Sequence, residues 1–350
     1  MKATSRQYKF RMLQKIEDAA IDAEVASLLA RGWEIAGNIQ GEKAVDQLRS
    51  ADKNFDVNEI ARYYTLKHVE KTIQGRDGNS IILSIYRPMK PDVLSGRPGI
   101  YYVHSGGMTF GNRFYGLSTV LPFVLHKRAV CVAVEYRLAP EHRAPAALND
   151  CYDALKWVGE HLDELGIHQK KLLIVGRGAG GALAAGTVLQ MRDNNEGPEL
   201  CGMMLNSPML DDRTNPMSMS SRKNKNVHWT HESNVYAWQQ VLGNDYNTDN
   251  VSPYIAPARA TDLSRLPPTY IDVGEREILV DEVLDFATKL QEADVKLVCR
   301  CWKDVYHCQD IVKRKSKLRS KILQDRFKWM DIMMLPSDRD DYLLGVIDFA

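Results

Sequence analysis

The sequence predicts an α/β fold in which a mostly parallel sheet is covered by helices on both faces. Two observations support this fold class: short, almost continuous apolar runs typical of buried strands, and helical patterns between most of them. The strands predicted from the apolar runs cover 99–103, 129–134, 172–175, 202–205, 269–273 and 295–302. The helices predicted between them cover 146–165, 181–193 and 280–293. Such alternation favours parallel strands joined by helical crossovers.

The start of the predicted sheet has a different pattern. From residue 64 the apolar period changes to two, and a turn at Gly75 to Gly78 separates two such stretches, which predicts an antiparallel hairpin. Residues 1–60 have helical periodicity and are expected to form an N-terminal helical cap. We expect the α/β domain to span 61–350, with a cap insertion at about 211–266, where polar segments interrupt the alternation.

Composition excludes some classes of function. The chain has 350 residues, a formal net charge of +1 and no long apolar run, so we expect neither a nucleic-acid partner nor a membrane span. No leader pattern is visible at the N-terminus, which together with six scattered cysteines favours a cytoplasmic protein. We expect no cofactor. A homodimer stays open, and a small neutral substrate is compatible with this charge.

The most informative segment is the turn from the strand at 172–175 into the next helix. It reads Gly176-Arg177-Gly178-Ala179-Gly180, which keeps the flanking glycines of a G-x-S-x-G nucleophile elbow but has glycine at its centre. A phosphate-binding loop is the alternative, although the spacing fits neither G-x-G-x-x-G nor a Walker loop. The turn therefore resembles that of a serine hydrolase without its serine.

A second glycine-rich loop follows the strand at 99–103. Its sequence is His104-Ser105-Gly106-Gly107, at the place where hydrolases carry an HGGG-type loop. Small residues let backbone N–H groups approach a substrate oxygen, so the N–H groups of Gly106, Gly107 and Ala179 are expected to form an oxyanion hole. An ordinary glycine turn is the simpler alternative.

Together with further motifs, these residues identify a family resemblance. The chain resembles the hormone-sensitive-lipase-like branch of the α/β-hydrolase fold over residues 64 to 335. The matching segments are 104–107, 134–142, 145–151, 176–180, 208–213, 251–254 and 266–274. The resemblance implies an α/β-hydrolase fold with a helical cap, although a fold alone does not decide function.

The resemblance also assigns site residues. The catalytic acid of the family falls on Glu277, with Asp281 as the fallback, and the histidine of the family falls on His307. The order of elbow, acid and histidine is that of the family. A loop histidine without function is the alternative for His307. Cys299, Cys301, His307 and Cys308 also suggest a metal site, but their spacing lacks C-x2-C and argues against one.

Three positions depart from the family pattern. Arg177 replaces Asp, Gly178 replaces the nucleophilic Ser, and Ser105 replaces Gly. Arg177 is a candidate for binding a carboxylate or enolate, unless it turns outward. His104 and Ser105 are candidate substrate-binding residues, and Ser105 is also a candidate replacement nucleophile, although it belongs to the oxyanion loop rather than the elbow.

The missing serine decides the predicted function. Loss of a triad serine costs about 10⁶-fold in kcat, so an acyl-enzyme at the elbow is not expected. The remaining base and oxyanion donors suit proton transfer, elimination or cyclisation of a small apolar carbonyl compound. The alternatives are a non-catalytic receptor, as in the similar plant gibberellin receptors, and residual esterase activity through activated water or Ser105. An engineered Ser→Gly change is disfavoured, because it leaves Arg177 unexplained.

A basic stretch precedes the last predicted helix at 327–335. Seven Lys and Arg residues lie between 313 and 326. We interpret them as a solvated helix face, with an anionic membrane or an acidic partner as the alternative.

Overall fold

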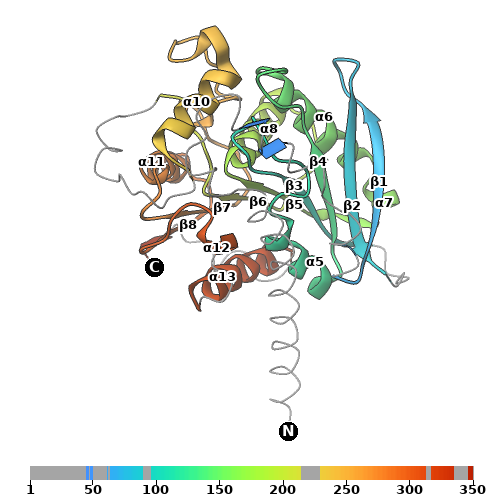
Figure 1. Ribbon diagram of the computed structural model, residues 1–350. Coiled ribbons are helices and arrows are strands. Elements are labelled where there is room, and N and C mark those ends of the chain that lie inside the picture. Colours follow the sequence, from blue (N-terminus) through green and yellow to red (C-terminus); the bar gives the residue numbers. More distant parts are fainter. Residues whose placement is uncertain are drawn as a thin grey trace.

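The computed structural model describes most of the chain and places one large sheet at its centre (Figure 1). The described residues are 45–46, 48–49, 61, 64–89, 96–213, 229–312, 317–334 and 346–349. The helical cap predicted over 1–60 lies outside them, apart from 45–46 and 48–49, which are helical.

Within the described residues, nine strands form the sheet in the order β1-β2-β4-β3-β5-β6-β7-β8-β9. β2 is antiparallel to both β1 and β4, and every other pair is parallel. The strands are β1 (Leu66–Gln74), β2 (Ser80–Pro88), β3 (Arg97–Val103), β4 (Val130–Glu135), β5 (Ile167–Arg177), β6 (Gly202–Asn206), β7 (Thr269–Gly274), β8 (Leu297–Trp302) and β9 (Val346–Phe349). The hairpin and the parallel sheet predicted from sequence are confirmed.

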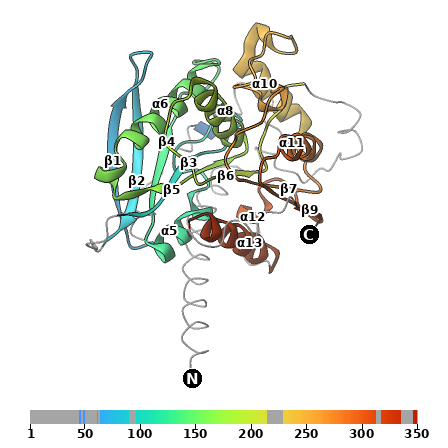
Figure 2. The same cartoon turned by 180° about the vertical axis from the view of Figure 1, so that it is seen from behind.

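Helices cover both faces of the sheet (Figures 1 and 2). One face carries α6 (Ala146–Glu160), α8 (Ala179–Asn194) and α11 (Val280–Glu292), and the other carries α5 (Leu121–Lys127) and α13 (Lys317–Met334). The remaining helical segments are α7 (Leu162–Leu165), α10 (His231–Leu242), α12 (Gln309–Val312), η1 (Leu117–Thr119), η2 (Gly243–Asp245) and η3 (Pro257–Arg259). None of the described helices is both long enough and apolar enough to cross a membrane.

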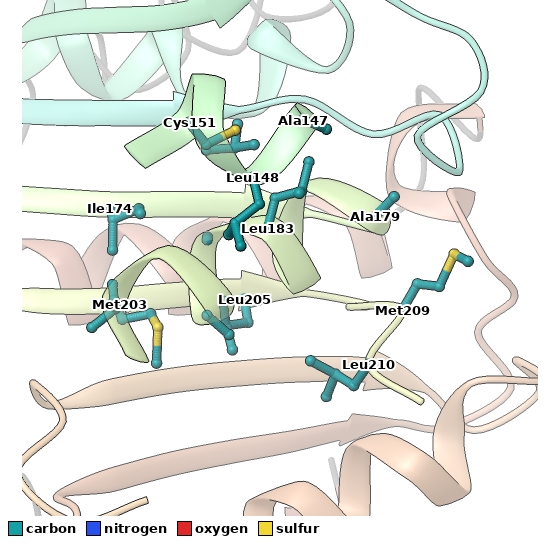
Figure 3. Packing of buried hydrophobic residues seen from close by; sticks show 14 of the residues in the cluster. Ala147, Leu148, Cys151, Ile174, Ala179, Leu183, Met203, Leu205, Met209 and Leu210 are labelled. Carbon is teal, nitrogen blue, oxygen red and sulfur yellow. The ribbon is translucent and has the colours of Figure 1, made fainter. Parts of the chain in front are cut away.

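The core on the α6–α8 face is built from small and branched side chains. Leu148 of α6 and Leu183 of α8 pack beside Ile174 of β5 and Leu205 of β6 (Figure 3). These residues are at most 2% exposed. The packing fixes α8 against the sheet and thereby fixes the turn between β5 and α8.

Two sequence predictions about peripheral segments have different outcomes. The insertion expected at about 211–266 contains α10, η2 and η3, while 214–228 lie outside the described residues. Of the basic stretch at 313–326, residues 317–326 belong to α13 and 313–316 lie outside the described residues. The interpretation of the stretch as a solvated face is wrong for two residues. Arg319 and Arg326 are only 3% and 4% exposed.

Candidate active site

The candidate site lies at the carboxyl ends of the central parallel strands. Ser105 follows β3, Gly178 follows β5, Glu277 follows β7 and His307 follows β8. In parallel sheets, loops at this edge bring residues from distant parts of the sequence together. The four residues expected from sequence therefore converge on one edge of the sheet.

The elbow keeps its sharp backbone although it has no serine. Gly178 has φ 52° and ψ −123°, and α8 begins at the next residue. Its N–H donates to the Asn206 carbonyl at 2.9 Å, and its carbonyl accepts from the N–H of Met209 at 3.0 Å. A Cβ on the flanking Gly180 would lie 2.2 Å from the His104 carbonyl oxygen, so this position requires glycine.

The space above Gly178 is shared by two polar side chains. A Cβ placed on Gly178 would lie 2.6 Å from Ser105 Oγ and 4.0 Å from His307 Nε2. Ser105 is 8% exposed, and its hydroxyl makes no hydrogen bond to any residue that the structure describes. The loop serine thus presents its hydroxyl close to the place where an elbow serine would carry its own.

His307 and Glu277 form a buried hydrogen-bonded pair. His307 Nδ1–H donates to Glu277 Oε2 at 2.6 Å. The other carboxylate oxygen, Oε1, accepts from Ser207 Oγ and from the Gly274 N–H, both at 2.7 Å. This arrangement fixes the tautomer of the ring and directs Nε2 toward the pocket. Glu277, rather than Asp281, is the partner of His307, and the catalytic role of the pair stays a prediction.

Two of the three expected oxyanion donors lie in the pocket wall. Gly107 and Ala179 line the pocket, and among the described residues the N–H groups of both have no protein acceptor. Ala179 is the first residue of α8, where backbone N–H groups have no partner within the helix. Gly106 is not part of this wall. Its carbonyl accepts from the N–H groups of Thr109 and Phe110, both at 3.0 Å, and so closes the loop.

His104 does not contact the pocket, which corrects its prediction as a substrate-binding residue. Its ring stacks on Tyr136 with centroids 4.0 Å apart, and its Nδ1–H donates to the Ser105 carbonyl at 2.7 Å. Burial lowers the pKa of His104 to about 3, so the ring is neutral. His104 therefore holds the loop that carries Ser105.

Arg177 is also turned away from the pocket, so its prediction as a substrate-binding residue is wrong. Its guanidinium makes two hydrogen bonds to Asp310, at 2.8 and 2.5 Å. Asp310 also accepts from Arg326 at 2.6 Å, and Arg326 reaches Asp272 at 2.7 and 3.0 Å. Burial alone would raise the pKa of Asp310, but the two guanidinium groups outweigh it and hold the pKa well below its ordinary value.

Cys308 is a pocket residue whose role sequence reasoning missed, because it was considered only as a metal ligand. It is 7% exposed, lines the pocket and follows His307 directly. Burial works to raise the pKa of its thiol, but His307 and Arg177 outweigh burial and lower the pKa. In His307, burial works to lower the pKa, while Cys308 and Glu277 outweigh it and raise the pKa to about 10. A thiol directly after the predicted histidine was the signal in the sequence.

The pocket has mainly apolar walls, and the space between them is about 430 Å³, part of which is open to solvent. Trp229, from the region expected as a cap insertion, forms one part of the wall. The described lining residues are Ser105, Gly107, Phe110, Tyr115, Gly178, Ala179, Met209, Trp229, Leu279, His307 and Cys308. Such a pocket suits a small apolar molecule with one polar group.

Sheet order, elbow, oxyanion loop and buried acid–histidine pair together define an α/β-hydrolase. A sequence model described as the alpha/beta hydrolase fold matches residues 100–310, and the chain belongs to this family, in its hormone-sensitive-lipase-like branch. The carboxylesterase NlhH of Mycobacterium tuberculosis is 32% identical over 235 residues, which are 65% of this chain and 71% of that protein. Esterase LipI of the same species is 28% identical over 247 residues, or 71% of this chain and 74% of LipI.

Solved structures of esterases also resemble this chain. A bacterial heroin esterase superposes with a TM-score of 0.72 at 30% identity, covering 83% of this chain and 90% of that one. Esterase LipW from Mycobacterium marinum has a TM-score of 0.75 at 27% identity, with 85% and 92% covered. The chain is therefore esterase-like in both sequence and fold.

Proposed function

We propose that this α/β-hydrolase is an enzyme that moves a proton on a small apolar carbonyl compound, in an elimination or a cyclisation. The observation that carries the proposal is the 2.6 Å hydrogen bond between His307 and Glu277 beside an elbow that has no side chain. An acid–base pair is of use to an enzyme and of no use to a receptor that only binds. The preserved pair therefore favours catalysis over the alternative of a non-catalytic receptor.

The remaining groups fit such a reaction. A carbonyl oxygen placed against the N–H groups of Gly107 and Ala179 gains stabilisation as it becomes an enolate or alkoxide oxygen. His307 Nε2 faces the same space, 4.0 Å from the point where a Cβ on Gly178 would lie. Acid–base help is worth about 10²- to 10⁴-fold and one oxyanion donor about 10²- to 10³-fold. Neither contribution needs a nucleophile at the elbow.

The direction of proton movement follows from the charges in the pocket. Glu277 and Cys308 raise the pKa of His307, which makes its neutral ring a strong base. The neutral ring takes the α-proton, which leaves an enolate and an imidazolium, and the imidazolium then returns a proton to the enolate or to a leaving group. Apolar walls from Phe110, Met209 and Leu279 keep water away from this exchange.

A second candidate function is ester hydrolysis with Ser105 as the nucleophile. Its support is the position of Ser105 Oγ, 2.6 Å from the point where an elbow Cβ would lie, in a chain whose relatives include esterases. Under this candidate, His307 takes the hydroxyl proton of Ser105. The two functions differ in the residue that they require, since the first has no use for the Ser105 hydroxyl.

The test compares the natural chain with His307→Gln and Ser105→Ala. We expect His307-dependent exchange of the α-protons of a saturated ketone such as 2-pentanone in D₂O, followed by NMR, and this exchange should survive in Ser105→Ala. Turnover of p-nitrophenyl butyrate by the natural chain should be at background level. Ester turnover that is lost in Ser105→Ala, without any ketone exchange, would instead establish the second candidate.

A further inference from the structure

Cys308 is a nucleophilic group in the pocket that the proposed proton transfer does not need. Cys308 follows His307 directly, and both residues line the same pocket as Gly107 and Ala179. Cys308 has φ 59°, in the region that favours glycine, so its backbone is held in a costly conformation. The turn that it forms is closed by the Ile311 N–H, which donates to the Cys308 carbonyl at 2.9 Å.

The charged groups around the thiol come from four parts of the chain. Arg177 at the end of β5 and His307 on the same loop favour the thiolate, whereas Glu277 acts on it through His307 and Asp310 at the start of α12 opposes it. Asp310 and Asp272 together balance the charges of Arg177 and Arg326, so His307 is the cation that acts most strongly on the thiol. A thiolate beside a cation is the form of cysteine that reacts with electrophiles.

A second polar group faces the same pocket without a partner. Ser105 is 8% exposed, and its hydroxyl has no hydrogen bond to any described residue. Since Ser105 Oγ is not one of the fully buried atoms that lack a partner, it is accessible from the pocket. The residues that line this mainly apolar pocket therefore carry a thiol, an imidazole, two N–H groups without a protein acceptor and one hydroxyl without a partner among the described residues.

We propose that Cys308 adds reversibly to the β-carbon of an α,β-unsaturated carbonyl compound whose oxygen lies against the N–H groups of Gly107 and Ala179. The inference rests on the proposed function, because both reactions pass through the same enolate. The thiolate forms a C–S bond as the C=C electron pair moves toward the carbonyl. The enolate then takes its α-proton from the His307 imidazolium, and the reverse steps release the compound unchanged.

The thiol of Cys308 and the N–H groups of Gly107 and Ala179 together favour an α,β-unsaturated carbonyl compound as the ligand. A thiolate is a soft nucleophile and reacts readily at the end of a conjugated double bond. The charge that develops there appears on the carbonyl oxygen, where the N–H groups of Gly107 and Ala179 are placed to stabilise it. An elimination next to a carbonyl also produces this class of compound, so the adduct and the proposed reaction share a ligand.

The experiment follows adduct formation with 2-cyclohexen-1-one by intact-protein mass spectrometry and peptide mapping. We expect one adduct, on Cys308, which is absent in Cys308→Ala and in Cys308→Ser but retained in Cys299→Ala, whose thiol is buried in β8. Iodoacetamide serves as the second probe, since its reaction needs a thiolate but no enolate. In His307→Gln, addition of the enone should slow about 10²-fold more than alkylation does, because proton transfer contributes only to the first reaction.

Several results would overturn the inference. They are an enone adduct on another residue, no adduct at all, or an equal effect of His307→Gln on both probes. An acyl group left on Cys308 by p-nitrophenyl butyrate would show that the thiol serves ester cleavage instead. The proposed function fails separately, through loss of 2-pentanone exchange, since that ketone has no conjugated double bond for the thiol to attack.

Discussion

Ser105 Oγ lies 2.6 Å from the point that a Cβ on Gly178 would occupy. Ser105 and Gly178, two of the positions where the sequence differs from the expected motif, therefore share one space. A side chain at either position restricts the other, so the oxyanion loop and the elbow cannot be interpreted independently. Because the two positions share one space, introducing an elbow serine at 178 also requires a change at 105.

Restoring the serine at the elbow should require two substitutions. In Gly178→Ser the new Cβ meets the Ser105 hydroxyl, which must rotate away, so we expect little gain of p-nitrophenyl butyrate turnover. In Gly178→Ser/Ser105→Gly the obstruction is gone and the new hydroxyl has His307 within reach. We expect the double variant to exceed the single variant by at least about 10-fold in kcat/KM, within the about 10⁶-fold that a triad serine contributes.

The matched control is Ser105→Gly alone, which should stay inactive toward the ester. Equal activity of the single and double Gly178 variants would show that the Ser105 side chain moves freely and that the two positions are not coupled. A burst of p-nitrophenol from the double variant would report an acyl-enzyme.

Glu277→Gln tests whether His307 needs its carboxylate partner, because the variant keeps the imidazole but removes the group that orients it. The amide keeps the size of the carboxylate but removes its charge, so the tautomer and the raised pKa of the ring both lose their support. We expect 2-pentanone exchange to fall about 10²- to 10⁴-fold while the fold is retained. Exchange rates by NMR and thermal unfolding of the same samples test this, and an unchanged rate would contradict a role for the pair.

Asp310→Asn should destabilise the protein strongly. The substitution leaves Arg177 and Arg326 buried with the charge of a single carboxylate, Asp272, to balance both. Breaking a buried ion pair costs about 3–5 kcal/mol of the free energy of unfolding, measurable by urea titration. The control is Asp304→Asn, whose pair with Arg276 is exposed and should contribute little.

The same carboxylate predicts a pH dependence of stability. Its pKa is lower in the folded chain than the ordinary 3.8, so its contribution is present above that pH and is lost as the pH falls below it. Urea titrations between pH 5 and pH 3 should therefore show a decline that is steeper in the natural chain than in Asp310→Asn. Equal slopes would mean that folding does not lower the pKa of Asp310.

Alkylation of Cys308 should remain fast at lower pH than alkylation of an ordinary thiol. The pKa of the Cys308 thiol is lowered, whereas the pKa of the neighbouring His307 is raised. Since the thiol pKa is lowered below the ordinary 9.0, its reaction with iodoacetamide should stay fast at pH values where a free thiol is already protonated. His307 releases its proton only near pH 10, so the pair should persist across the neutral range. Rates measured from pH 6 to 9, beside glutathione, provide the test, and parallel profiles would contradict the ion pair.

The sheet was predictable from the sequence, because its central strands are apolar runs with helical patterns between them. The pairing of Glu277 with His307 was implied by the family resemblance, which left Asp281 as the fallback for the acid. β9 was not predicted from the sequence. The burial of Arg177 and Arg326 was not predictable either. Arg177 pairs with Asp310 and Arg326 pairs with Asp272, and each of these partners lies on another element. Local composition around Arg326 indicates only a basic helix face.

The Arg177–Asp310 pair also has a consequence for redesign of the elbow. The family resemblance implies Asp at position 177, and Arg177→Asp would place a second buried carboxylate against Asp310. We expect this substitution to be tolerated only if residue 310 changes with it, whatever stands at position 178. Engineering an ordinary elbow therefore has to include α12, although none of its described residues lines the pocket.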